Sequence, residues 1–423
     1  MTKYIPKQPN FISVESIYKA KMRLKPVIWR TPLMHNPQLS ENFDCQIYLK
    51  REDLQVVRSY KIRGAYNKMA SLPKSDLANG VVCASAGNHA QGVALACHLL
   101  GVNGTIVMPS TTPKQKIDKV RLFGKEHINI ILKGDTFDDS YSCARQLEKE
   151  KAMLFVHPFD DQAVIEGQAT VGLEIIEDID VPIDYVFVAI GGGGLASGLG
   201  SYIKQISPST RIIGVEPAGA PAMYQSLKAG KIVTLDEIDN FVDGAAVKQV
   251  GKKTFAICKR VIDDMILVPE GEVCTTILRL YNEEAIVAEP AGALTIAALA
   301  HYREQIKGKN VVCILSGGNN DITRTEDIRE RSLLQLGLKH YFIVSFPQRA
   351  GALRDFLNNI LGPEDDITHF EYTKKNNRDN GPALVGIELN RKEDYDGLIS
   401  RMQEHNIDFQ TLNDNPMLFD LLV

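Results

Sequence analysis

The chain has 423 residues, 44% of them hydrophobic and 24% charged, a composition that predicts a globular protein of two or three domains and excludes collagen-like and low-complexity chains. Its 48 Lys and Arg against 52 Asp and Glu give a formal net charge of -4, which favours a small-molecule partner over nucleic acid or an anionic membrane. Seven scattered cysteines predict neither a disulfide framework nor a zinc site, and an N-terminus without an apolar core, in a chain without a long apolar run, predicts a cytoplasmic protein.

Up to about residue 320, short apolar runs alternate with amphipathic helical stretches, a pattern typical of an α/β protein with mainly parallel sheets. Several runs are nearly continuous in Val and Ile, as in strands that are covered on both faces. Helices are expected at 64–71 and 90–100. The predicted strands are 46–50, 80–84, 104–108, 129–132, 153–156, 185–189, 211–215 and 311–315.

The pattern changes after residue 322, where a charged segment with a short leucine stretch predicts a connecting helix. The elements expected beyond it are strands at 340–346, 367–373 and 383–389, helices at 352–361 and 394–404, and a last strand between 410 and 422. That βαββαβ order is the ferredoxin-like plan of small regulatory domains. We therefore expect a first domain at 1–322, a linker at 323–338 and a second domain at 339–423.

Lys61 is the first candidate for chemistry, at the head of the helix predicted at 64–71. A lysine by itself is usually a solvated surface charge. This one lies beside Ser59 at a helix start, where backbone N–H groups and the helix dipole favour an anion. A lysine next to an anion site that also holds an aldehyde cofactor can form a Schiff base.

A second polar turn, Ser85 to His89, follows the strand predicted at 80–84 and opens the next helix. Its free N–H groups and side-chain donors are enough to hold a carboxylate. The alternative is an ordinary helix N-cap formed by Ser85 or Asn88.

Four consecutive glycines follow the strand predicted at 185–189 and precede a helix, in the run Gly191, Gly192, Gly193, Gly194 and Leu195. Glycines weaken strands and helices and so have little structural use here, whereas a cradle of backbone N–H groups around a phosphate needs them. A dinucleotide fingerprint fits less well. It would need Ala196 as its third glycine, and Glu216 at the end of the next strand is followed at once by Pro217.

The fourth polar turn, Ser316 to Asn320, follows the strand predicted at 311–315. In an open parallel sheet the turns at the carboxyl ends of strands converge on one crevice. A single cofactor site built from the four turns is therefore the expected arrangement.

The motifs SYKIRGA, SAGNHAQGVA, GGGGLASG, EPAGA and SGGNND resemble those of the fold-type II enzymes that use pyridoxal 5'-phosphate, and among them the biosynthetic threonine dehydratases, or threonine ammonia-lyases. The resemblance covers nearly the whole chain. It implies a tryptophan synthase β-like catalytic domain of two parallel-sheet subdomains, the smaller one, at roughly 56–160, inserted in the larger. An ACT-like α+β domain follows.

The resemblance also implies a reaction, the β-elimination of L-threonine to 2-oxobutanoate and ammonia at the start of isoleucine synthesis. A neutral hydroxyl at the pyridine nitrogen makes the ring a weaker electron sink and favours elimination over transamination. The implied roles are Lys61 as Schiff-base lysine and Cα base, Asn88 at the ring hydroxyl, Gly191 to Leu195 at the phosphate, Ser316 at the pyridine nitrogen, and Ser85, Gly87, Asn88 and His89 at the substrate carboxylate.

Two departures from related serine racemases narrow the choice. Ala86 occupies the position of their second base, so racemisation is not expected. Ala222 stands six residues after Glu216, where those enzymes have an aspartate that binds a divalent cation, so no metal is predicted, with a monovalent cation left open.

Two residues keep two interpretations each. Glu289 lies either near the cofactor ring or only at the cap of a helix that begins at Pro290. His89 is either a packed residue at a helix start or an active participant.

The tail resembles the single regulatory domain of shorter biosynthetic threonine dehydratases, with Arg349 to Leu353 as the first strand-to-helix loop. It implies isoleucine as feedback inhibitor, valine as a second candidate effector, and a homotetramer. For the tail, the alternative is a role in oligomerisation alone. For the whole protein, the alternatives are a serine-preferring dehydratase or β-replacement enzyme, and a non-catalytic amino-acid sensor.

Overall fold

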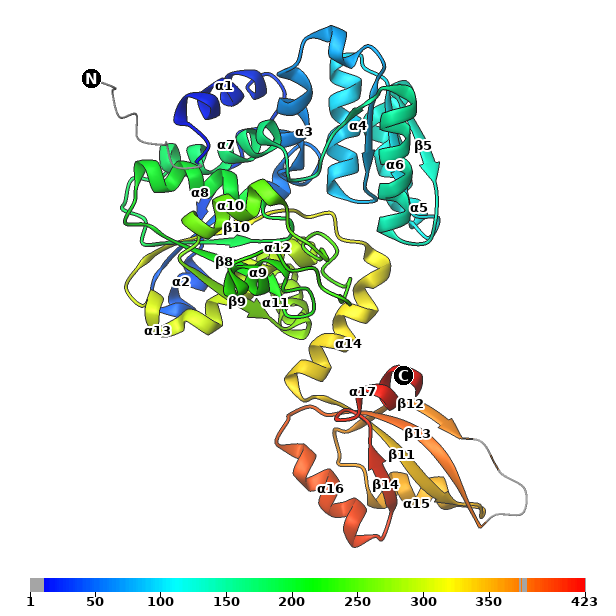
Figure 1. The fold of residues 1–423 in the computed structure, drawn as a ribbon. Helices are drawn as coiled ribbons and strands as arrows, with labels where there is room; N and C mark the ends of the chain where they lie inside the picture. Colours follow the sequence, from blue (N-terminus) through cyan, green and yellow to red (C-terminus); the bar gives the residue numbers. More distant parts are fainter. Residues whose placement is uncertain (1–10, 373, 375–378, 423) are drawn as a thin grey trace. The chain divides into compact units, whose positions relative to one another are not determined.

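The computed structural model describes residues 11–372, 374 and 379–422. The chain divides into two units, Met1–Ile322 and Thr323–Val423. Within the described residues, the first unit holds a six-stranded and a four-stranded sheet, and the second holds one four-stranded sheet (Figure 1). Among the described residues of both units, no helix is both long enough and apolar enough to cross a bilayer.

The six-stranded sheet has the order β1-β2-β10-β7-β8-β9, parallel except for β1. Its strands are β1 (Leu33–His35), β2 (Gln46–Arg51), β7 (Tyr185–Ala189), β8 (Arg211–Pro217), β9 (Asp264–Val268) and β10 (Asn310–Leu315). The two edge strands were not predicted. β1 has only three residues, which is too short to show an apolar run, whereas the apolar run at 265–268 in β9 was overlooked.

The smaller sheet has the parallel order β5-β4-β3-β6. Alternate residues of β3 point to opposite faces. Val81 and Cys83 pack in the core formed with α4, whereas Val82 and Ala84 pack with Ala144 of α6. The elements are β3 (Val81–Ala84), β4 (Gly104–Met108), β5 (Ile128–Leu132), β6 (Leu154–Phe155), α4 (Asn88–Leu100), α5 (Lys114–Gly124) and α6 (Phe137–Lys151).

Helix packing joins the two sheets of the first unit. α3 (Lys61–Ala70) packs on α7 (Gln162–Asp178), and α7 packs on α8 (Gly194–Ile206). The approach of α3 to α7 requires glycine, because a Cβ on Gly167 would lie 2.4 Å from the Arg63 carbonyl oxygen. This packing fixes the helix that begins at Lys61.

The other helices of this unit lie around the two sheets (Figure 1). They are α1 (Val14–Leu24), α2 (Pro37–Phe43), α9 (Ala222–Ala229), α10 (Lys252–Val261), α11 (Glu270–Glu284), α12 (Pro290–Ala297), α13 (Arg303–Ile306), and the short 3-10 helices η1 (Glu52–Leu54), η2 (Lys74–Leu77), η3 (Lys125–His127) and η4 (Ala298–Tyr302). A further 3-10 helix, η5 (Ile322–Arg324), lies at the boundary between the two units in the sequence.

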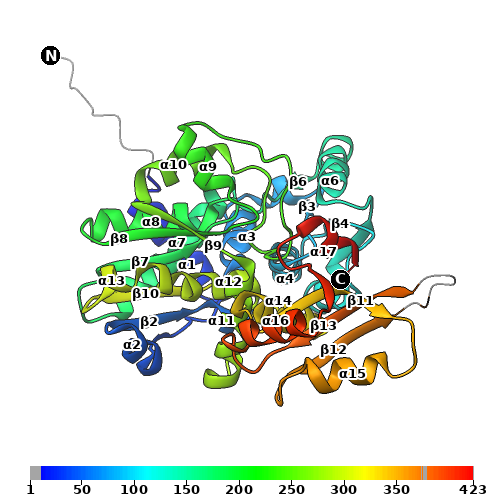
Figure 2. The ribbon, with the colours of Figure 1, turned by 90° about the horizontal axis from the view of Figure 1, so that it is seen from below.

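The second unit has an antiparallel sheet in the order β12-β13-β11-β14, with α15 and α16 sharing one core on it (Figure 2). The βαββαβ order is thus confirmed. Its elements are α14 (Thr325–Leu336), β11 (Lys339–Pro347), α15 (Ala352–Asn359), β12 (Asp366–Tyr372), β13 (Asn380–Glu388), α16 (Asp394–Glu404), β14 (Asp408–Thr411) and α17 (Pro416–Leu422).

The last strand, predicted between 410 and 422, is β14, but it ends at Thr411 and the rest of that range holds α17, which was not predicted. Asn413 accepts the Tyr341 N–H and donates to the Lys339 carbonyl, so its side chain takes over backbone groups of β11 beyond the end of the β14 pairing. Pro416 then occupies the first helical position, where its missing N–H costs nothing.

Candidate functional site

Lys61 is the first residue of α3, and its side chain is half-buried. Its Nζ donates to the Pro158 carbonyl at 3.3 Å and lies 5.3 Å from the centre of the Tyr60 ring. The residues before it pair with the turn that follows β10, because Ser59 forms a β-bridge with Gly317 and the Tyr60 N–H donates to the Ser316 carbonyl. Backbone hydrogen bonds therefore hold the turn that contains Lys61 against the turn that contains Ser316.

The glycine run lies between β7 and α8, and Gly193 has φ 90°, a conformation that favours glycine. A Cβ on Gly192 would lie 2.3 Å from the ring of Phe159, and one on Gly191 would lie 2.9 Å from the Ala245 backbone. The interpretation that these glycines have little structural use was wrong, since close packing also requires them. Phe159 follows Pro158, the acceptor for Lys61, and so links the glycine turn to the lysine.

The turn from Ser85 to Gly87 connects β3 to α4. Neither Ser85 nor Asn88 caps this helix. Gly87 is the N-cap residue and no side chain bonds to the first turn, while Ser85 Oγ accepts only the Gly87 N–H, at 3.2 Å. The alternative of an ordinary N-cap was therefore wrong. The uncapped N–H groups of α4 form a site that suits an anion.

His89 is buried, and its Nε2 lies 2.8 Å from the Val156 carbonyl oxygen. Burial, reinforced by the nearby charge of Lys61, lowers the pKa of His89 to about 3. The ring is therefore neutral at physiological pH, which favours the packed interpretation of this residue.

Asn88 connects two further segments of the site. Its Nδ2 donates to Glu289 Oε1 at 2.7 Å, and its Oδ1 accepts from Asn319 Nδ2 at 2.7 Å. Glu289 is the N-cap residue of α12, but its carboxylate caps nothing and is directed to Asn88 instead. Of its two interpretations, the structure thus favours a place among the site residues.

Burial, reinforced by the charge of Asp243, raises the pKa of Glu289 to about 7. The carboxylate also approaches the Ser316 turn so closely that a Cβ on Gly317 would lie 2.3 Å from Glu289 Oε1. Ser316 is buried at the end of β10, and its Oγ donates to the Ala291 carbonyl at 3.3 Å. All four polar turns thus lie close together. Glu289 and Asn319 also belong to this site; both occur in the motifs EPAGA and SGGNND, but neither was assigned a definite role from the sequence.

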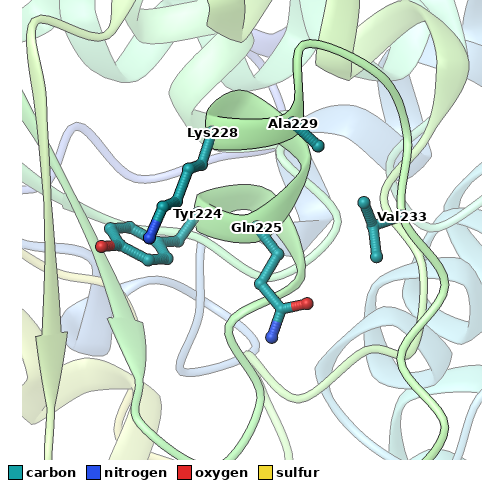
Figure 3. Close-up of a pocket in the computed structure, with 5 residues that line it drawn as sticks. All are labelled: Tyr224, Gln225, Lys228, Ala229 and Val233. Carbon is teal, nitrogen blue, oxygen red and sulfur yellow. The ribbon is translucent and has the colours of Figure 1, made fainter.

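A cavity and a cluster of possible metal ligands lie outside the four turns. A cavity of about 420 Å³ lies beside α9, and Lys228 in its lining extends over the Tyr224 ring (Figure 3). His98, Glu126 and His127 bring their ligand atoms within 4.8 Å of one another near α4 and η3.

Glu216 at the end of β8 supports α9. Its two carboxyl oxygens accept the N–H groups of Met223 and Tyr224, both at 2.8 Å. A Cβ on Gly193 would lie 2.8 Å from Met223 Cε, so α9 is packed against the glycine turn. Burial raises the pKa of Glu216 to about 8 from an ordinary value of 4.5.

We expect the replacement Glu216→Gln to make stability less dependent on pH. A carboxyl whose pKa is raised by folding stabilises the fold fully below about pH 4.5, and this contribution is lost as the pH rises through about 8. Glutamine keeps an acceptor but has no charge. The melting temperature of the variant minus that of wild type should therefore increase from about pH 5 to about pH 8. A constant difference, equal to that of the exposed control Glu237→Gln, would contradict the buried titration.

Comparison with known proteins gives matches for both units. Residues 24–317 match the family model described as pyridoxal-phosphate dependent enzyme, and residues 330–422 match that of the C-terminal regulatory domain of threonine dehydratase. The chain is 59% identical to the biosynthetic L-threonine dehydratase IlvA of Halalkalibacterium halodurans, over 97% of this chain and 99% of that one. It is also 59% identical to the enzyme of that name in Bacillus subtilis, over 99% of each chain.

Two solved structures align with about three quarters of this chain. The processed form of threonine deaminase isoform 2 from Solanum lycopersicum aligns with a TM-score of 0.72 and 41% identity, over 77% of this chain and 91% of that one. Maize serine racemase aligns with a TM-score of 0.71 and 31% identity, over 76% of this chain and 98% of that one.

Proposed function

The chain belongs to the pyridoxal-phosphate-dependent threonine dehydratases, and on that basis we propose that it converts L-threonine to 2-oxobutanoate and ammonia as the first step of isoleucine synthesis. The identity of 59% over 97% of this chain and 99% of its relative carries the proposal. The convergence of the four polar turns around Lys61 supports it.

The residues of the site suit a phosphorylated aldehyde cofactor. Gly191 to Leu195 end in the uncapped N-terminus of α8, whose backbone N–H groups would hold the phosphate. Asn88 would bond the ring hydroxyl, and Ser316 Oγ would face the pyridine nitrogen. When bound, pyridoxal phosphate supplies an acceptor for the electrons of the substrate Cα–H bond.

The start of α4 would receive the substrate carboxylate. Ser85 contributes its hydroxyl, Asn88 and His89 contribute backbone N–H groups that no side chain caps, and Gly87, whose N–H donates to Ser85 Oγ at 3.2 Å, completes the turn. The ring of His89 is neutral and engaged with Val156, so only its backbone would take part. This arrangement orients the amino acid for the reaction at Cα.

Lys61 Nζ would remove the Cα proton. Among the described residues, Lys61 Nζ donates to the Pro158 carbonyl oxygen at 3.3 Å, a bond long enough to exchange readily. Ala86 offers no side-chain base in the carboxylate turn. Because racemisation by two bases needs a group on each face, a single lysine favours elimination.

Release of 2-oxoacid by the purified protein from L-threonine and from L-serine tests this function. We expect threonine to be the better substrate by kcat/KM. A higher kcat/KM for serine would favour the serine-preferring alternative, which the similarity to maize serine racemase keeps in view. Absence of turnover with either amino acid would favour the non-catalytic sensor.

We further propose that residues 339–423 bind isoleucine and thereby lower the affinity for threonine, with valine as a second candidate effector and a homotetramer as the assembly. A match to the C-terminal regulatory domain of threonine dehydratase at 330–422 supports this proposal. Every residue with a proposed catalytic role lies within the first unit, Met1–Ile322, so the second unit is free to serve regulation.

We expect a chain that ends after Ile322 to keep threonine turnover and to lose its response to isoleucine. In the full chain, isoleucine should raise the threonine concentration for half-maximal rate by roughly 5- to 150-fold, the usual range of allosteric coupling. The shortened chain should show no such increase. An undiminished response would mean that isoleucine binds the first unit, and an insensitive full chain would leave the tail with an oligomerising role.

A further inference from the structure

A chain of four side chains runs through the site from Lys119 to Glu289. Lys119 Nζ donates to Asn319 Oδ1 at 3.2 Å, Asn319 Nδ2 donates to Asn88 Oδ1 at 2.7 Å, and Asn88 Nδ2 donates to Glu289 Oε1 at 2.7 Å. The members come from α5, from the turn after β10, from the start of α4 and from the N-cap of α12. The proposed function uses only Asn88 of these four.

We call these four hydrogen-bonded side chains the relay. Groups that can only donate or can only accept fix the direction of its hydrogen bonds. An asparagine side chain has a donor end and an acceptor end of nearly equal shape, so an isolated asparagine can turn over. The Lys119 ammonium can only donate. The Val57 carbonyl, to which Asn319 Nδ2 also donates at 2.8 Å, can only accept. Asn319 therefore has one satisfactory orientation.

The same reasoning then applies to Asn88. Its Oδ1 must face the Asn319 donor, and its Nδ2 must face the Glu289 carboxylate. Nδ2 carries two hydrogens, and no second acceptor contacts it among the described residues. One N–H of Asn88 is therefore held ready to donate to a ligand, and its carbonyl oxygen is kept away from that role.

We propose that Lys119, Asn319 and Glu289 are positioning residues that hold the Asn88 amide with its N–H group toward the ring oxygen of the cofactor. This inference rests on the proposed function for the place of Asn88. A donor at that oxygen stabilises its anionic form, whereas a turned amide would present a carbonyl and destabilise it.

The charges at the two ends agree with this role. Burial lowers the pKa of the half-buried Lys119, and the nearby Glu289 and Asp321 oppose that shift, so these two carboxyl groups favour its ammonium form. The Glu289 carboxylate is in turn stabilised by Asn88 and by the Asn319 backbone. Two half-buried asparagines thus lie between an amino group and a carboxyl group.

The absorption spectrum of the purified holoprotein provides the test, because the anionic ring form absorbs in the visible and the neutral form in the near ultraviolet. Asn319→Asp has the same shape but cannot donate to Asn88 or to Val57. Lys119→Met removes the terminal donor and keeps the length of the side chain. We expect each to lower the ratio of visible to near-ultraviolet absorbance by roughly fivefold, the effect of one hydrogen bond.

The control is Lys114→Met, an exposed lysine on the same helix, which should leave the ratio unchanged. Variants whose melting temperature stays within about 2 °C of this control report on orientation and not on folding. If Asn319→Asp does not fold, Lys119→Met decides. Ratios equal to that of the control in both variants would overturn the relay and leave the threonine activity standing.

Failure of the proposed function gives a different result. If the relay variants change the absorbance ratio but the wild-type holoprotein does not turn over threonine, the relay is supported and threonine is rejected as the substrate. A purified protein without any cofactor absorbance would overturn both.

Discussion

Replacement of Lys61 by alanine should lower kcat for L-threonine by more than about 10³-fold, because in the proposed mechanism one side chain serves both as the covalent attachment and as the Cα base. Lys61 Nζ lies 3.3 Å from the Pro158 carbonyl oxygen, and no other residue to which we propose a role would take the Cα proton. Assay of 2-oxobutanoate release, together with the visible absorbance of the purified protein, gives both readouts.

The control for this experiment is Lys68→Ala on the same helix. Lys68 pairs with Asp161 at 2.8 Å and takes no part in the site, so its loss should leave turnover nearly intact. A Lys61→Ala protein that retained more than about a tenth of the wild-type rate would show that another group removes the proton.

The second large effect concerns Arg63, which is fully buried two residues after Lys61. Its guanidinium pairs with Glu52 and with Glu174, both at 2.7 Å, and Lys50 also pairs with Glu174 at 2.7 Å. Burial alone would lower the pKa of Arg63, but the two carboxylates raise it above its ordinary value. Likewise burial would raise the pKa of Glu174, but Arg63 and Lys50 lower it. Arg63 and Glu174 are therefore both held in their charged forms.

We expect Arg63→Met to destabilise the protein by about 3–5 kcal/mol, since it leaves Glu52 buried without its cation and Glu174 with only Lys50. Arg30 is exposed and pairs with Glu177 at 2.9 Å, so Arg30→Met should lower the free energy of unfolding by no more than about 1 kcal/mol. Thermal unfolding of both variants makes the comparison. Adding Glu52→Gln to Arg63→Met should recover part of the loss, and equal melting temperatures for Arg63→Met and Arg30→Met would contradict the role of the cluster.

The strands and polar turns of the first unit could be predicted because each depends on local sequence. A continuous Val and Ile run marks a strand covered on both faces, and glycine or asparagine after it marks a turn. β1 was missed because three residues are too short to show such a run, and the run at 265–268 in β9 was overlooked. α17 was not foreseen because the apolar residues after Thr411 were not separated from the last strand at Asn413 to Pro416.

The site was predicted to the level of its motifs and no further. Sequence spacing does not show that Glu289 faces Asn88 or that Lys119 reaches Asn319, since these pairs are separated by about 200 residues and meet only through packing. The same holds for Arg63 and Glu174, which are brought together by the close approach of α3 and α7. The packing role of the glycine turn depends on Phe159, which belongs to none of the motifs.

Borohydride reduction of the purified holoprotein, followed by peptide mapping, tests most directly whether the four turns form one pyridoxal phosphate site around Lys61. We expect the reduced cofactor to be recovered on the peptide that contains Lys61 and on no other. Recovery on a different lysine, or no labelled peptide from a protein that turns over threonine, would contradict the assignment.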